Sequence, residues 1–304
     1  MHVGVDWGGT KIEAIALDDD GRTLYRNRVD TPRSDYEGCL KAIVDLVDHL
    51  EAATERCERV GIGLPGSLDP RTGVAKGASS TWMNGRRAED DLAHALGRSV
   101  RTSNDADCFA VSEAVDGAGV GHRTVFAVIL GSGAGAGVAI DGRAHHGPNN
   151  GAGEWGHNPL PLPDVTEIPG SPCYCGKYGC METWVSGRAF SRDYQRHAEI
   201  DLATAVTLSP ARIVERMRAD DRLARLVWHR YVDRVARGLS LVLNILDPDV
   251  LVMGGGMSNV DELYTDLPPA LARYAFSPVL YTPVVRAAHG DSSGVRGAAW
   301  LWKS

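Results

Sequence analysis

Three cysteines and one histidine form the strongest chemical signal in the sequence. Cys173, Cys175 and Cys180 lie in the segment SPCYCGKYGCMET, and His157 precedes them in GEWGHNP. One imidazole and three thiolates are a ligand set of closed tetrahedral zinc sites. The C-x-C-x4-C spacing differs from the C-x-x-C of a thioredoxin-like redox pair. The sequence therefore predicts a zinc site, and because four protein ligands leave no open position, the metal is expected to be structural.

Carboxylates lie on both sides of these predicted metal ligands. Glu154 precedes His157 by three residues, and Glu182 follows Cys180 by two. A metal that holds this loop would bring Glu154, His157 and Glu182 together, where they can bind the hydroxyl groups of a polyol. His157 would then bind zinc through one ring nitrogen and the polyol through the other.

Two glycine-rich segments suit phosphate binding. In DWGGTK, Asp6 to Lys11, glycines let backbone N–H groups face an anion, Lys11 adds positive charge, and Asp6 can hold Mg²⁺ through water. A plain hairpin turn is the alternative interpretation, and the spacing is not that of a Walker A loop. The segment GSGAGAG at 131–137 precedes a strand, whereas a dinucleotide-binding fingerprint precedes a helix. With the glycines at 254–256, these segments predict one nucleotide held between two halves.

A further acid stands where a short strand is expected to meet a helix. The segment SNDAD spans 103–107 and contains Asp105. A side chain at such a junction can enter a cleft, so Asp105 is a candidate catalytic residue. The alternative is a helix N-cap, a role that either Asn104 or Asp105 can fill.

The elements that must position these residues alternate between strands and helices, as in α/β layers. A strand, a glycine turn and a second strand are expected at 2–21, and the same pattern recurs at 124–142, which indicates an internal duplication. Further strands are expected at 23–29, 59–66, 100–103, 250–256 and 282–288. Helices are expected at 35–54, 88–97, 107–115, 222–247 and 293–302, the first with Leu40, Ile43, Val44, Val47 and Leu50 on one stripe.

Length and composition exclude several classes of protein. A chain of 304 residues suggests two domains, and its net charge of -7 argues against nucleic-acid binding. No segment approaches the roughly 18 apolar residues of a membrane span, and the first residues are not a signal peptide. A cytoplasmic location is therefore expected, where reducing conditions disfavour disulfides. Cys39, Cys57 and Cys108 are expected on helices, in the core.

Taken together, the motifs resemble the ROK family of bacterial sugar kinases. The segments that carry the resemblance are DWGGTK, GIGLPGSLD, SNDADCFAVSEA, GAGEWGHNP and CYCGKYGCME. The cysteine motif with its preceding E-x-G-H is highly specific for that family, and the resemblance spans nearly the whole chain. Three further segments look closer still to bacterial fructokinases of the manno(fructo)kinase kind, namely STWMNG, LNILDPDVLVMGGGMSNVDELY and HGDSSGVRGAAWLW.

The resemblance implies a fold, an assembly and a metal. The fold is the duplicated, ribonuclease H-like fold of actin-like ATPases, with two α/β domains and the active site in the cleft between them. Homodimers are frequent in the family, and a structural zinc ion is usual. We expect an N-terminal domain at 1–117 and a larger C-terminal domain with the zinc loop at 118–292. The family also implies that the last helix, about 293–304, returns to the N-terminal domain.

The same resemblance implies roles for individual residues. Asp105 would be the general base. The hexose would be held by Gly66, Asn104, Asp105, Glu154, His157 and Glu182. The nucleotide and its Mg²⁺ would be held by Asp6, Gly9, Thr10, Lys11, Gly131, Ser132, Gly133, Gly255 and Gly256. Zinc would be bound by His157, Cys173, Cys175 and Cys180.

The expected activity is transfer of a phosphoryl group from ATP to the 6-hydroxyl of D-fructose, and also of mannose. The alternatives are a glucokinase or an N-acetylglucosamine kinase of the same family, or a sugar sensor without catalysis. The family's repressors place a DNA-binding module before the first glycine hairpin, which here begins at residue 6, so a repressor is not expected. Ser79 stands where many members carry a sugar-binding Asn, and Ser132 stands where Thr is common.

Overall fold

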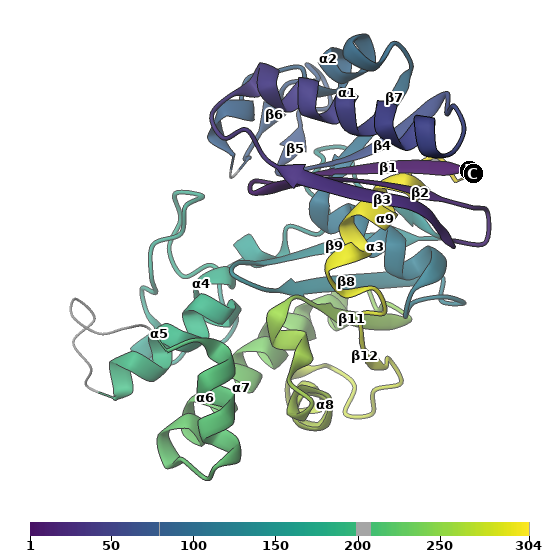
Figure 1. Cartoon of the computed structure of the whole chain (residues 1–304). Helices are drawn as coiled ribbons and strands as arrows, with labels where there is room; N and C mark the ends of the chain where they lie inside the picture. The colour runs from purple at the N-terminus through teal and green to yellow at the C-terminus, as the bar shows by residue number, and fades with distance from the viewer. Residues whose placement is uncertain (79, 199–207, 304) are drawn as a thin grey trace. The chain divides into compact units, whose positions relative to one another are not determined.

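The computed structural model describes residues 1–78, 80–198 and 208–303, which form two compact units (Figure 1). The first unit comprises Met1–Ala127, Gly137–Gly153 and Ala288–Ser304, and the second comprises Val128–Ala136 and Glu154–Ala287. The domain boundaries expected at 117/118 and 292/293 stay a prediction. Within the described part of the chain, no helix has the length and apolar character needed to cross a membrane.

The first unit is built on a five-stranded sheet of order β3-β2-β1-β4-β7. Strands β1, β2 and β3 pair antiparallel, whereas β4 and β7 run parallel to β1. Asp6 lies opposite Gly63, and Leu64 lies opposite Asn104, so the carboxyl ends of the parallel strands meet at one edge of the sheet. The strands are β1 (His2–Trp7), β2 (Lys11–Leu17), β3 (Thr23–Asp30), β4 (Arg59–Leu64) and β7 (Ser99–Asn104), with a small ladder of β5 (Ser67–Leu68) and β6 (Ala75–Lys76).

A second five-stranded sheet has the order β10-β9-β8-β11-β12. Its order matches that of the first sheet. In both sheets, two hairpins join three consecutive strands, and the next strand in the order pairs with the first of these three after a crossover. This match confirms the duplication that the repeated strand–glycine–strand pattern predicted. The strands are β8 (Thr124–Leu130), β9 (Ala134–Ile140), β10 (Arg143–Ala144), β11 (Val250–Gly254) and β12 (Val284–Arg286), and the division between the units runs within β8 and β9.

Helices cover both faces of the first sheet, with α1 on one face and α9 on the other (Figure 1). Helix α1 buries Ile43, Val47 and Leu50, as its apolar stripe predicted, and Val44 is half-buried. Helix α9 approaches β4 so closely that a Cβ at Gly61 would overlap the carbonyl oxygen of Ala298. The helices of this unit are α1 (Tyr36–Ala53), α2 (Ala88–Leu96), α3 (Asp105–Asp116) and α9 (Ser293–Trp300), with short 3-10 turns η1 (Thr81–Met83) and η5 (Gly290–Ser292).

The second unit is organised around the long helix α7, which contacts α4, α5, α6 and α8. The aromatic rings of Phe190, Trp228 and Tyr231 pack against one another between α5 and α7. The helices are α4 (Glu182–Val185), α5 (Gly187–His197), α6 (Pro210–Arg218), α7 (Arg222–Ile245) and α8 (Glu262–Tyr274), with 3-10 turns η2 (Trp155–His157), η3 (Val165–Glu167) and η4 (Gly256–Asn259). The sequence pattern had not predicted α4, α5 or α6.

One of the three isolated cysteines was predicted wrongly. Cys39 and Cys108 are buried on α1 and α3, as expected, but Cys57 lies outside any helix and is half-buried. Helix α1 ends at Ala53, and the chain must then turn into β4, which begins at Arg59. The Cys57 thiol donates a hydrogen bond to the carbonyl oxygen of Arg59 at 2.7 Å, so it stabilises this connection.

Candidate functional site

In the first unit, the candidate residues gather at the carboxyl ends of β1, β4 and β7. Asp6 lies near the end of β1, and Gly9, Thr10 and Lys11 form the exposed turn into β2. Ligands of open α/β sheets bind outside the carboxyl ends of parallel strands. The arrangement therefore suits a ligand that meets both the glycine turn and the start of α3.

The Asp6 carboxyl is the most strongly perturbed acid at this edge of the sheet. Its pKa is raised from 3.8 to about 7, mainly by burial and then by the negative charges of Asp105 and Glu13. A cation bound beside two carboxylates would offset their mutual repulsion. Asp6 is therefore suited to hold a divalent cation, and this role stays a prediction.

Asn104 and Asp105 lie at the junction of β7 and α3. The Asn104 side chain caps α3 by accepting a hydrogen bond from the N–H of Ala106 at 2.8 Å. Its amide nitrogen donates to the carbonyl oxygen of Gly66 at 2.9 Å, which ties the turn after β4 to the helix. Asp105 is the first residue of α3, exposed, and its Oδ1 accepts from the N–H of Ala106 at 2.8 Å. The capping role therefore belongs chiefly to Asn104, and Asp105 is the exposed first residue of the helix.

A small polar cavity of about 240 Å³ opens beside Gly66 and Asn104 in the same unit. Its wall includes Asp107, and Oδ2 of that buried carboxylate lies 3.0 Å from Nδ1 of His146. The hydrogen bond with Asp107 raises the pKa of His146. The sequence did not single out His146, because two adjacent histidines, His145 and His146, have no spacing typical of a catalytic or metal site.

The second unit holds the other two glycine segments. The Gly131 N–H donates to the carbonyl oxygen of Gly133 at 2.9 Å, which closes the turn between β8 and β9 around Ser132. A Cβ at Gly255 would lie 2.6 Å from the backbone of Leu130, and the residue has a φ of 78°, so only glycine fits there. The segment at 254–256 therefore packs directly on the glycine turn of β8 and β9, and Gly256 begins η4.

These segments open onto a cavity of about 1050 Å³ within the second unit. Gly131, Ser132 and Gly256 line one side of it. Arginines of α5, the first residues of α6, and Ser171 and Pro172 of the loop before Cys173 line other parts of it. A cavity of this size suits a nucleotide or a ligand of similar dimensions. The sequence had predicted the glycine residues of this cavity, but not the residues of α5 and α6.

The predicted metal ligands come together in the second unit. Ligand atoms of His157, Cys173, Cys175 and Cys180 all lie within 4.8 Å of one another. Nδ1 of His157 is 3.5 Å from Sγ of Cys173, and Sγ of Cys175 is 3.6 Å from Sγ of Cys180. A tetrahedron with Zn–S bonds of about 2.3 Å and a Zn–N bond of about 2.0 Å has edges of roughly 3.5–3.8 Å. The donor set and its spacing are therefore compatible with a structural zinc ion.

The polar residues around the four predicted metal ligands lie only partly where the sequence predicted them. Nε2 of His157 faces Tyr174, whose hydroxyl lies 2.9 Å away, and a carboxylate oxygen of Glu154 at 4.0 Å. Glu182 begins α4, and its Oε2 accepts a hydrogen bond from the N–H of Ala134 at 3.3 Å. Glu154 thus lies beside His157 as predicted, whereas Glu182 also braces the β8–β9 turn.

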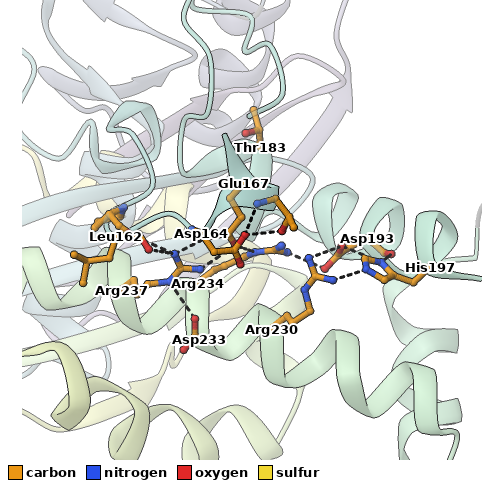
Figure 2. A network of polar contacts seen from close by, with 12 residues as sticks. Leu162, Asp164, Glu167, Thr183, Asp193, His197, Arg230, Asp233, Arg234 and Arg237 are labelled. Atoms are coloured by element: carbon orange, nitrogen blue, oxygen red, sulfur yellow. Dashed lines mark hydrogen bonds and ion pairs between the residues drawn. The ribbon is translucent and has the colours of Figure 1, made fainter. Parts of the chain in front are cut away.

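The loop between His157 and Cys173 is held by a buried network of charges (Figure 2). Arg237 donates two hydrogen bonds of 2.9 Å to the Glu167 carboxylate, and Arg234 donates a third at 2.8 Å. Arg234 also pairs with Asp193 of α5 at 2.8 Å. The exposed fraction of each of these four residues is at most 7%. The network therefore fastens the metal-binding loop to both α5 and α7.

The Glu167→Gln variant is expected to lose about 3–5 kcal/mol of unfolding free energy, because it removes the carboxylate that neutralises two buried arginines. Arg237 then keeps only the partly exposed Asp233, at 3.0 Å, as a charged partner. Burial acts to raise the pKa of Glu167, but the hydrogen bonds from Arg237 and Arg234 prevail and lower it from 4.5 to about 2. A group with a lowered pKa stabilises the folded protein fully at pH values above its unfolded-state pKa. That stability is lost as the pH falls through its folded-state pKa. The stability difference between the two proteins should thus shrink from pH 4.5 to pH 2.

Chemical denaturation across this pH range measures the effect. Glu215→Gln is the matched control, because Glu215 forms an exposed pair with Arg212 on α6 and should change stability by less than about 1 kcal/mol. A Glu167→Gln protein as stable as the control variant would contradict a structural role for the network.

Known proteins are similar to this chain over nearly its whole length. The model of the ROK family matches residues 2–304. The chain is 37% identical over 307 residues to an N-acetyl-D-glucosamine kinase of Haemophilus influenzae, covering 99% of each chain. A solved ROK hexokinase from Thermus thermophilus is 31% identical with a TM-score of 0.86, covering 99% of this chain and 97% of its own. A ROK family glucokinase from Streptomyces griseus, solved with glucose and AMPPNP, is 30% identical with a TM-score of 0.79, covering 99% and 98%.

Proposed function

This chain belongs to the ROK family of sugar kinases, and we propose that it phosphorylates the 6-hydroxyl group of a hexose with ATP, preferring N-acetyl-D-glucosamine. Its duplicated sheets agree with the actin-like ATPase fold of that family, as predicted. The observation that carries the choice of sugar is full-length identity of 37% and 38% to N-acetyl-D-glucosamine kinases of two genera. The finer prediction of a fructokinase has no such support.

Fructose remains the second candidate acceptor because of two segments near the C-terminus. These two segments resemble bacterial fructokinases, and they are LNILDPDVLVMGGGMSNVDELY and HGDSSGVRGAAWLW. Identity near 38% does not decide between sugars, because one group in a pocket can change the preference. Ser79, which the sequence analysis connected with the choice of hexose, lies outside the described residues.

In the proposed mechanism, Asp105 accepts the proton of the 6-hydroxyl as that oxygen attacks the γ-phosphorus of ATP. The bond between the γ-phosphorus and the β-bridging oxygen breaks, and ADP leaves. Asp105 suits this role because it is exposed at the start of α3, while Asn104 supports the helix cap. We assign the sugar to Gly66, Asn104, Asp105, Glu154, His157 and Glu182.

Catalysis of phosphoryl transfer depends mostly on positioning and on stabilisation of charge. The backbone amides of the glycine turns and Lys11 would hold the phosphates, and Asp6 would hold Mg²⁺ through water, which offsets the negative charge of the triphosphate. We assign the nucleotide and its Mg²⁺ to Asp6, Gly9, Thr10, Lys11, Gly131, Ser132, Gly133, Gly255 and Gly256. Structural zinc would be bound by His157, Cys173, Cys175 and Cys180, and assembly as a homodimer stays a prediction from the family.

The proposal is tested by steady-state ADP release with MgATP and a panel of sugars. N-acetyl-D-glucosamine is expected to give the highest kcat/KM among N-acetyl-D-glucosamine, fructose, mannose and glucose, because full-length relatives carry that name. The position of the new phosphate is checked by offering the product to an enzyme that phosphorylates the 6-hydroxyl. A product that already carries its phosphate there accepts no second one. A higher kcat/KM with fructose would make fructose the preferred acceptor, and the assignment as a sugar kinase would stand. No turnover with any of the four sugars would reject the kinase and favour a sugar sensor.

A further inference from the structure

The buried Asp107 carboxylate forms a single ion pair within the part of the chain that the structure describes, and its partner is His146. Its Oδ2 lies 3.0 Å from Nδ1 of His146, and the Ser103 hydroxyl donates to the same oxygen at 3.5 Å. Its Oδ1 is buried, and no described group hydrogen bonds to it. A buried carboxylate is costly unless a positive charge compensates it. The His146 imidazole therefore stabilises this charge, and it does so best when it is protonated.

Helix α3 is one end of the link that this pair makes. Asp107 lies in the first turn of α3, two residues after Asp105, the proposed general base. Asn104 caps the same turn, and its amide nitrogen donates to the carbonyl oxygen of Gly66 at 2.9 Å. A partner that holds Asp107 in place therefore also fixes the turn whose residues we assign to the sugar.

The loop at 145–153 is the other end of the link. The N–H groups of Gly151 and Ala152 both donate to the carbonyl oxygen of His146, at 3.2 and 3.1 Å, so the loop folds back on this residue. Glu154, a proposed sugar ligand, is the next residue along the chain. The place at which His146 is held therefore sets where the chain leaves the loop and enters the segment GEWGH.

The other charged groups at the small cavity beside His146 have partners of their own. Asp69, in the turn after β5, lies 3.8 Å from the amine of Lys76. Glu89 of α2 accepts two hydrogen bonds from β7, at 2.8 and 2.6 Å. Asp107 is the group that hydrogen bonds to His146, and this bond raises the pKa of the imidazole although burial acts to lower it. The charge of His146 is therefore governed chiefly by Asp107.

We propose that His146 is a positioning residue for the sugar, which acts by fastening the loop before Glu154 to the first turn of α3 through Asp107. The inference rests on the proposed function, because residues at both ends of this link are assigned to the sugar there. A hydrogen bond between two charged groups is stronger than one in which the imidazole is neutral. The sugar should therefore bind more tightly when His146 is protonated, and affinity should fall as the pH rises through the pKa of His146.

Calorimetric titration measures sugar binding by the parent and three variants from about pH 5 to about pH 9, a range that spans the titration of a histidine. The sugar is N-acetyl-D-glucosamine, or fructose if fructose binds the parent more tightly. His146→Ala removes the bond to Asp107, whereas His146→Gln keeps an N–H donor that does not titrate. His145→Gln is the matched control, because the neighbouring His145 side chain is exposed. Thermal unfolding checks that each variant is folded.

At the acid end of this range, His146→Ala should weaken sugar binding about tenfold, because it removes a hydrogen bond between charged groups. His146→Gln should bind more tightly than His146→Ala and show no pH dependence of the parent's kind, and the His145→Gln control should follow the parent at every pH. A folded His146→Ala protein that binds sugar as the parent does would overturn the proposal. So would a His146→Gln protein that keeps the parent's pH dependence. Sugar phosphorylation is measured in parallel, and sugar binding without turnover would reject the proposed function alone.

Discussion

Replacing Asp105 with asparagine is expected to lower kcat for sugar phosphorylation by about 10²–10⁴-fold, because an amide cannot accept the proton of the attacking hydroxyl. The change keeps the size of the side chain, and asparagine retains an oxygen that can accept from the N–H of Ala106, as Asp105 does at 2.8 Å. Asn104 also caps α3 through its own side chain. The sugar should therefore still bind, and the loss should fall on kcat rather than on KM.

Steady-state kinetics with MgATP and thermal unfolding measure this result together. Asp90→Asn is the matched control, since Asp90 is an exposed acid of α2 that pairs with Arg87 at 2.6 Å. It should leave kcat unchanged. Loss of the negative charge at the start of α3 should cost Asp105→Asn no more than about 1 kcal/mol of stability. Near-normal turnover of Asp105→Asn would show that another group takes the proton.

The position of Asp105 was predictable because it depends on local pattern. A short strand that ends in a polar residue and meets a helix places that residue at the edge of a parallel sheet. The same logic correctly placed Asp6 near the end of β1 and Asn104 at the end of β7. The clustering of His157 with three cysteines was predictable for a related reason, because cysteines at close spacing in a Gly/Pro loop have few uses other than metal binding.

The Glu167 network and the arginines of α5 that line the cavity of the second unit were not predictable, because they depend on contacts between distant segments. Glu167 pairs with Arg237, which lies 70 residues away in the chain. Helix α5 is polar, and the face that it buries is set by its packing on α7 rather than by a long apolar stripe. The spacing of Arg188, Arg192 and Arg196 is visible in the sequence, but it becomes meaningful only once α5 is known to be a helix beside the glycine turn.

Replacing Cys175 with serine is expected to remove the zinc ion and most of the activity at ordinary sugar concentrations. Cys175 is exposed, so the change removes a metal ligand and hardly any buried surface. Zinc in structural sites contributes to folding energy directly, by about 10–16 kcal/mol in small zinc-finger peptides. Here the Glu167 network also holds the loop, so we expect the fold to persist and the effect to fall on His157 and Glu154 beside the metal.

The expected consequence for kinetics is a raised KM for the sugar, because His157 is both a proposed metal ligand and a proposed sugar ligand, and a bound metal would set its orientation. Metal analysis, thermal unfolding and kinetics of Cys175→Ser measure the three effects. Cys57→Ser is the control, since Cys57 lies outside the cluster and its thiol bonds only to the carbonyl oxygen of Arg59, at 2.7 Å. It should keep its zinc and its KM. If Cys175→Ser lost all metal and kept the sugar KM of the parent, the metal would have no part in placing the sugar ligands, and the loop would be held by the charge network alone.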